Sequence, residues 1–155
     1  IGVSMPTFKL KSRTKVGAIG TARPEAPSVR GVIEGGILTL VIPDLPRGPN
    51  GPKGTIRSHW SVNAKERRKW SNWVRLALAD VWDKYGDRIA DGKKYVTIYM
   101  FRKRLMDKDN AYTSVKYVLD ALKYWGLIVD DSDQFCDLTV EQAVSKTTYT
   151  KIFVY

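Results

Sequence analysis

The stretch that decides the fold is DKDNAYTSVKYVLDALKYWGLIVDD, residues 107–131. Its middle, residues 111–125, carries apolar side chains at helical spacing, namely Val115, Val118, Leu119 and Leu122. Such spacing is typical of a helix with one buried face, and Gly126 follows it, as glycine often follows the last turn of a helix. We therefore predict an amphipathic helix over residues 111–125, with aspartates on both sides of it.

Outward from this stretch, we predict a strand over residues 37–42, a run rich in β-branched residues that Pro43 stops. Further strands are predicted over residues 94–101, where aromatic and β-branched residues alternate, and over residues 135–144 and 148–155. A second helix is predicted from Asn63, read as its N-cap with Glu66 as capping-box partner, to Tyr85. The last two strands are separated by a short polar turn, which favours an antiparallel hairpin. The expected order is β-α-β-α-β-β, an α/β (α+β) fold with a single mixed sheet and two helices packed on it.

The chain has 155 residues, the size of one domain. Residues 1–35 lack sustained periodicity and are rich in Lys and Arg, so we predict a basic N-terminal extension there and a folded domain over residues 36–155. The extension is interpreted either as an arm that folds onto nucleic acid or as an inert segment. No signal peptide or membrane-spanning run is visible, so we expect the cytoplasm of a bacterial or phage-infected cell.

The 26 Lys and Arg outnumber the 16 Asp and Glu, which gives a formal net charge of +10. This excess favours a polyanionic partner, nucleic acid rather than a membrane. Cys136 is the single cysteine and His59 the single histidine, which excludes an internal disulfide, a cysteine zinc cluster and a multi-histidine metal site. Because Cys136 falls in an alternating apolar run, we predict that it is buried in a strand.

Acidic residues flank the predicted helix on both sides. In an extended segment Asp107 and Asp109 point the same way, and Asp130 and Asp131 follow after the helix. If the helix packs back against the preceding strand, carboxylates from both ends converge, and oxygen ligands of this kind suit Mg²⁺. We interpret this cluster as the metal site of a nuclease. Lys116 shares a helical face with Tyr112 and Asp120 and could hold the scissile phosphate or neutralise developing charge. The alternative is that the acids serve only as helix caps and turns.

Residues 102–131 resemble the RusA family of Holliday junction resolvases in the order of their motifs. These are the basic Arg102-Lys103-Arg104, then Asp107-x-Asp109-Asn110, Lys116-x-x-x-Asp120 and Gly126-x-Ile128-x-Asp130-Asp131. The resemblance implies a homodimeric endonuclease that needs Mg²⁺, with Mn²⁺ able to substitute, and that cuts four-way DNA junctions by paired symmetric nicks in DNA recombination, repair or phage DNA processing.

The resemblance also implies roles for single residues. Asp107, Asp109 and Asp131 match the metal-binding catalytic carboxylates and Lys116 the catalytic lysine, while Asp130 and Asp120 match supporting acids. About three residues are inserted before Lys116 relative to the family spacing, close to one helical turn.

Basic residues that are candidates for contacts with the DNA backbone are Arg102, Lys103, Arg104, Arg67, Arg68, Lys69, Arg57 and Lys53. Contacts of this kind fix position without reading sequence. Two other functions fit the same charge pattern: a non-catalytic basic module that binds nucleic acid, and a related metal nuclease acting on other branched DNA.

Overall fold

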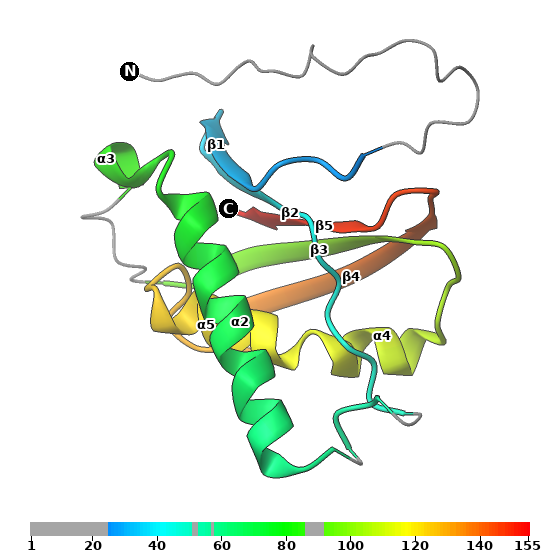
Figure 1. Ribbon diagram of the computed structural model, residues 1–155. Coiled ribbons are helices and arrows are strands. Elements are labelled where there is room, and N and C mark those ends of the chain that lie inside the picture. The colour runs from blue at the N-terminus through cyan, green and yellow to red at the C-terminus, as the bar shows by residue number, and fades with distance from the viewer. Residues whose placement is uncertain (1–24, 51–52, 57, 86–91) are drawn as a thin grey trace, which may run out of the picture.

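The computed structural model describes residues 25–50, 53–56, 58–85 and 92–155 (Figure 1). Its centre is a sheet of five strands in the order β1-β2-β5-β3-β4. The strands are β1 (Arg30–Glu34), β2 (Ile37–Ile42), β3 (Lys94–Arg102), β4 (Cys136–Val144) and β5 (Tyr149–Val154). β4 runs parallel to β3, and the other neighbours are antiparallel. The predicted α/β class with a mixed sheet is therefore confirmed.

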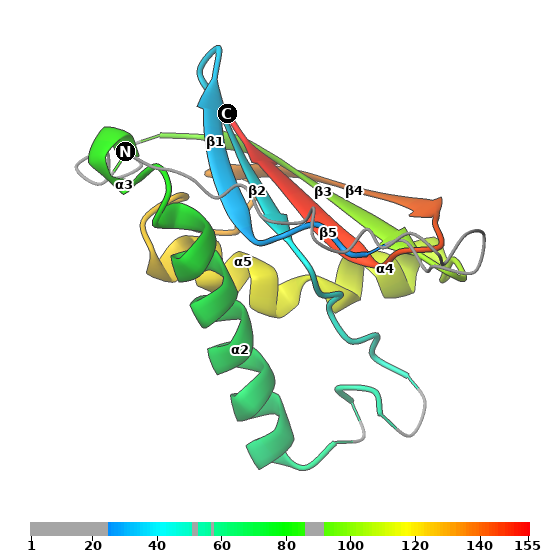
Figure 2. The ribbon, with the colours of Figure 1, turned by 45° about the horizontal axis from the view of Figure 1, so that its top comes forward.

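The helices are α2 (Trp60–Leu78), α3 (Trp82–Tyr85), α4 (Lys108–Ser114) and α5 (Lys116–Tyr124). α2 and α5 cover the same face of the sheet, as Figures 1 and 2 show from two directions. Within the described part of the chain, no helix is long and apolar enough to cross a membrane.

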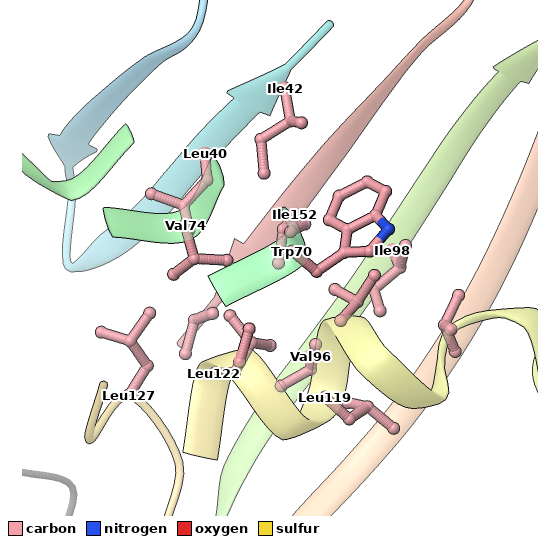
Figure 3. Packing of buried hydrophobic residues seen from close by; sticks show 14 of the residues in the cluster. Leu40, Ile42, Trp70, Val74, Val96, Ile98, Leu119, Leu122, Leu127 and Ile152 are labelled. Atoms are coloured by element: carbon pink, nitrogen blue, oxygen red, sulfur yellow. The ribbon is translucent and has the colours of Figure 1, made fainter. Parts of the chain in front are cut away.

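The hydrophobic core lies between these two helices and the sheet (Figure 3). Trp70 and Val74 of α2 and Leu122 of α5 are fully buried, as are Leu40, Ile98 and Ile152 of the strands beneath them. Each such side chain contributes about 1.5–3 kcal/mol by leaving water. Cys136 is 3% exposed at the start of β4, which confirms its predicted burial.

The predicted C-terminal hairpin is wrong. β4 and β5 follow each other in sequence, but β3 lies between them, and β5 pairs with β2 on its other side. Thr150, Ile152 and Val154 all bury their side chains, which suits a central strand. By contrast, β4 lies at the end of the sheet order and exposes Asp137 and Glu141, and charged side chains are typical of edge strands.

The predicted order β-α-β-α-β-β lacks the first strand. β1 occupies residues 30–34, inside the predicted extension 1–35, and pairs with β2 in a hairpin. Its turn is Gly35-Gly36, with φ values of 57° and 80°, the left-handed conformation that tight hairpin turns require. The sheet therefore begins before residue 36. The basic residues of 1–24 lie outside the described residues.

The predicted helix 63–85 is wrong at both ends. α2 begins at Trp60 because His59 caps it: His59 Nδ1 accepts a hydrogen bond from the backbone nitrogen of Ser61 at 3.2 Å. Asn63 lies within the helix and donates from Nδ2 to the carbonyl oxygen of Thr55 at 2.9 Å. The chain leaves α2 after Leu78 and forms α3 only beyond a turn.

The predicted helix 111–125 is a pair of helices, α4 and α5, that begins earlier and breaks at Val115. Two hydroxyl groups donate hydrogen bonds back to main-chain oxygen atoms just before the break. Ser114 Oγ donates to the oxygen of Ala111 at 2.7 Å, and Thr113 Oγ1 to that of Asp109 at 2.9 Å. Hydroxyl groups that bond back to preceding carbonyls often bend helices. The sequence spacing alone did not predict this break.

The end of α5 agrees with the prediction. Gly126 has φ 77° and donates its N–H to the oxygen of Lys123 at 3.1 Å. Leu127 donates to the oxygen of Leu122 at 2.9 Å, and this pair of bonds is the Schellman motif that closes many helices.

Candidate functional site

Asp107 and Asp109 lie where the chain leaves β3 and enters α4. Both are exposed, Asp107 at the N-cap position and Asp109 in the first turn. The Asp107 side chain makes no capping hydrogen bond. Across the described residues neither carboxylate takes part in an ion pair. A helix N-terminus favours negative charge, yet the specific hydrogen bond of a capping aspartate is not formed.

The segment before this pair is held by Gln142 of β4. Its Oε1 accepts from the backbone nitrogen of Met106 at 3.1 Å, and its Nε2 donates to the backbone oxygen of Met106 at 2.9 Å. Because Asp107 is the next residue, Gln142 positions the predicted ligand. The sequence carries no signal for this contact, since the two residues are 36 positions apart.

Asp130 and Asp131 lie in the connection between α5 and β4. Lys123 Nζ is 3.4 Å from Asp130 Oδ1 and 3.6 Å from Asp131 Oδ1. Burial by itself would lower the pKa of Lys123, but the charge of Asp131 and the hydrogen bond to Asp130 outweigh it and raise that pKa. A hydrogen bond from Ser132 is the main cause that lowers the pKa of Asp130. At this end of α5 a single lysine therefore balances part of the charge of the two acids.

The expected convergence of the carboxylates is wrong for a single chain. β3 and β4 are parallel in the register Lys94↔Cys136 to Arg102↔Val144, so a segment that follows β3 and one that precedes β4 lie at opposite ends. β3 has nine residues, and at about 3.3 Å per step its ends are about 26 Å apart. Figure 1 shows α4 and α5 covering this span. Among the described residues no group of three His, Cys, Asp or Glu side chains fits a metal ion.

Lys116 and Asp120 lie on α5 but differ in their surroundings. Lys116 is exposed, whereas Asp120 Oδ2 is 3.7 Å from Arg67 Nε on α2. Tyr112, predicted to share their face, turns to β4, where its hydroxyl accepts from the backbone nitrogen of Val140 at 3.2 Å. Tyr112 therefore does not share the predicted face, because the break at Val115 interrupts the helical phase, whereas Lys116 and Asp120 are four residues apart within α5.

One group of the predicted DNA contacts lies near the exit of β3. Lys103 and Arg104 are exposed there, but Arg102 is half-buried and donates from Nε to the oxygen of Arg104 at 3.3 Å. Burial lowers the pKa of the Arg102 guanidinium. Lys53 is exposed in the loop before α2, and Arg57 lies outside the described residues.

The other group lies on α2. Arg67 contacts Asp120 and also lies over the ring of Tyr117, 5.1 Å from its centroid. Lys69 Nζ pairs with Asp44 at 3.1 Å and with Glu66 at 3.0 Å, so its charge is balanced within the chain. Arg68 is exposed and forms no ion pair within the described residues, which leaves it available to an external anion.

Glu66, predicted to be the capping-box partner of Asn63, is instead a buried charge. Its side chain accepts from Trp70 Nε1 at 3.2 Å and pairs with Lys69 and, at 3.5 Å, with Arg47 in the loop before α2. The i, i+4 spacing of Glu66 and Trp70 was the available signal, since it places both on one helical face.

The resemblance to RusA resolvases rests on the motif residues alone, because comparison with known proteins adds no support. No protein-family model matches the chain, and no curated protein matches it.

Proposed function

We propose that the protein is a metal-dependent endonuclease that acts on branched DNA, with the four-way junction as its substrate. The observation that carries the proposal is the exposed pair Asp107 and Asp109. The Asp107 side chain forms no capping hydrogen bond, and neither carboxylate has an ion-pair partner among the described residues. Exposed Lys103 and Arg104 precede it. Free carboxylates beside cations suit a site that gathers a divalent ion next to a phosphate.

The third predicted ligand, Asp131, is at the far end of the same chain, so the proposal needs a second copy. In a C₂ dimer, any contact from one end of the first subunit to the other end of the second occurs twice. We propose that Asp107 and Asp109 of one subunit face Asp131 of the partner subunit. Two such sites then match the two-fold symmetry of a four-way junction.

The first test is cleavage of a labelled synthetic four-way junction, with Mg²⁺, Mn²⁺ or EDTA. We expect paired, religatable nicks that need the metal and are lost in Asp109→Asn, while junction binding persists or strengthens because a negative charge near phosphate is removed. Asp133→Asn, which changes an exposed acid in the turn before β4, is the matched control and should cut normally. Linear duplex cut as readily as the junction would show that junction specificity is wrong.

The second test is subunit complementation. Asp109→Asn and Asp131→Asn chains with different affinity tags are produced together, and the mixed dimer is purified. If ligands come from both subunits, one of the two sites in the mixed dimer is intact, so single nicks return although each parent is inactive. If each chain supplies its whole site, both sites of the mixed dimer stay damaged and no nicking is seen.

A second candidate is a nucleic-acid-binding module without catalysis. It is favoured by the pairing of both Asp130 and Asp131 with Lys123, which gives these acids a structural role. Tight junction binding without cleavage in either metal would support this candidate against the nuclease.

A further inference from the structure

A pocket of about 550 Å³ lies between α2 and the end of α5. Arg67 and Arg68 of α2 line one side, and Lys123, Tyr124 and Trp125 line the other. Most of its lining is apolar, and its volume is in the range of sites that enclose a small ligand or part of a larger one. Arg67 and Arg68 are also among the predicted contacts with the DNA backbone.

The charge at the pocket favours an anion. Three cationic side chains, Arg67, Arg68 and Lys123, line it against a single carboxylate, Asp120. Arg67 is held by Asp120, and Lys123 by the acids that follow α5. Among the described residues that line the pocket, Arg68 is therefore the guanidinium that forms no ion pair and can bind a phosphate.

Aromatic rings form another wall. Trp125 is fixed, because its Nε1 donates to the backbone oxygen of Ser71 at 3.0 Å. The ring of Tyr124 stands at 85° to that of Trp125, with 5.2 Å between centroids, and Tyr124 is 75% exposed. A large ring left in water beside a fixed indole offers a flat ligand a surface for stacking.

We propose that this pocket binds an unpaired nucleotide of a DNA strand, with the base against Tyr124 and Trp125 and the phosphate at Arg68. A nucleotide combines the two features that the pocket requires, a flat ring and an anionic group. A neighbouring hollow of about 430 Å³ shares Arg68 and Asn72 with the pocket and is also lined by Lys65 of α2. Because these residues recur along one exposed side of the helix, the strand has a basic path out of the pocket.

The inference rests on the proposed function only in taking DNA as the partner, and it specifies which part of the DNA is held. Lys123 connects the two proposals, since it lines the pocket and contacts Asp131. A nucleotide drawn out of a junction would therefore lie next to the acid predicted to bind metal.

The test is binding in EDTA, where cleavage does not contribute, with a short oligothymidylate and a duplex of equal length as probes. Tyr124→Ala should weaken binding of the single strand about 5- to 150-fold, the effect of losing one base–aromatic stack, and leave duplex binding unchanged. Tyr95→Ala is the matched control, because Tyr95 is 47% exposed but does not line the pocket. Oligothymidylate should also quench tryptophan fluorescence, and Trp125→Phe should remove that quenching.

Arg68→Ala should reduce the slope of log affinity against log salt by about one, as expected for one lost phosphate contact. Lys84→Ala, which removes an exposed cation of α3 outside the pocket, should leave the slope of single-strand binding unchanged.

Equal losses in Tyr124→Ala and Tyr95→Ala, or no loss in either, would overturn the pocket assignment. So would dissociation of a dimer by Tyr124→Ala, seen by sedimentation, because the pocket would then be a subunit contact. Normal junction cleavage by a Tyr124→Ala protein that binds single strands normally would reject this inference and leave the nuclease intact. Tyr124-dependent binding without cleavage in either metal would reject the nuclease alone.

Discussion

Trp70 donates a hydrogen bond from its indole nitrogen to Glu66 Oε2 at 3.2 Å, which places a carboxylate inside the apolar core beneath α2. Glu66 is 4% exposed and is also bound by Lys69 and Arg47. These contacts attach the loop before α2 to the helix itself.

Glu66→Ala should lower the free energy of unfolding by about 3 kcal/mol, because it breaks a buried charge network and leaves the Trp70 donor without its partner. We take the lower end of the range for buried pairs, because Lys69 and Arg47 are 38% and 40% exposed and can turn to water. Urea unfolding measures the loss. Arg47→Ala, which removes one exposed partner, should cost less than about 1 kcal/mol, and equal losses would contradict the central role of Glu66.

Gly31→Ala should destabilise the fold by about 1–3 kcal/mol, the usual cost of overpacking. Gly31 lies in β1, where a Cβ atom would meet the backbone oxygen of Ala77 near the end of α2. Thermal and urea unfolding both report the change. Gly92→Ala is the control, since a Cβ there has no neighbour within 4 Å among the described atoms. A neutral Gly31→Ala would show that β1 does not press against α2.

Gln142→Leu should lower the cleavage rate about 100-fold, the effect of displacing a reacting group by about 1 Å, without weakening junction binding. The reason is that the Gln142 amide holds both backbone groups of Met106, immediately before Asp107. Single-turnover cleavage and binding in EDTA separate the two effects. Gln142→Glu keeps the acceptor for the Met106 nitrogen and should fall between wild type and Gln142→Leu. Parallel losses of binding and cleavage would instead indicate a general structural defect.

Stability should fall at alkaline pH through Cys136. Burial is the main cause that raises the pKa of its thiol above the ordinary value. A group whose pKa is raised in the folded state contributes fully below its unfolded pKa, about 8.5 for cysteine, and its contribution is lost as pH rises toward the folded pKa. Urea unfolding across this window should show a decline that Cys136→Ala reduces. An identical decline in the variant would assign the effect to other groups.

Whether a feature of this structure can be predicted depends on whether neighbouring residues determine it or residues far apart in the sequence. The strands at 37–42 and 94–101 and the cap at Gly126 follow from side-chain types and backbone chemistry within a few residues, and these predictions are confirmed. The hairpin error arose because a short connection says nothing about whether a third strand enters between its arms, as β3 does. The Gly35-Gly36 pair is a local signal for the turn between β1 and β2, and the predicted boundary at residue 36 does not use it.

The candidate site shows the same division. The prediction that Asp107 and Asp109 point the same way in an extended segment is wrong, because α4 begins at Lys108 and places Asp109 in its first turn. The distance to Asp131 depends on whether β4 runs parallel to β3, which neighbouring residues do not determine. A strand, a helix and a parallel strand place the two loops of the crossover at opposite ends of the sheet. Gln142 and Glu66 act through contacts that only the folded chain creates.

The position of β5 has a consequence for synthesis of the chain. β5 lies between β2 and β3, although both are made long before it. On the ribosome, where synthesis proceeds from the N-terminus, β2 and β3 must therefore wait with unpaired edges until residues 149–154 emerge. Unpaired strand edges are templates for aggregation. A nascent chain that stops before Tyr149 would thus hold an incomplete sheet with unpaired strand edges. We expect such a chain to aggregate or to bind chaperones.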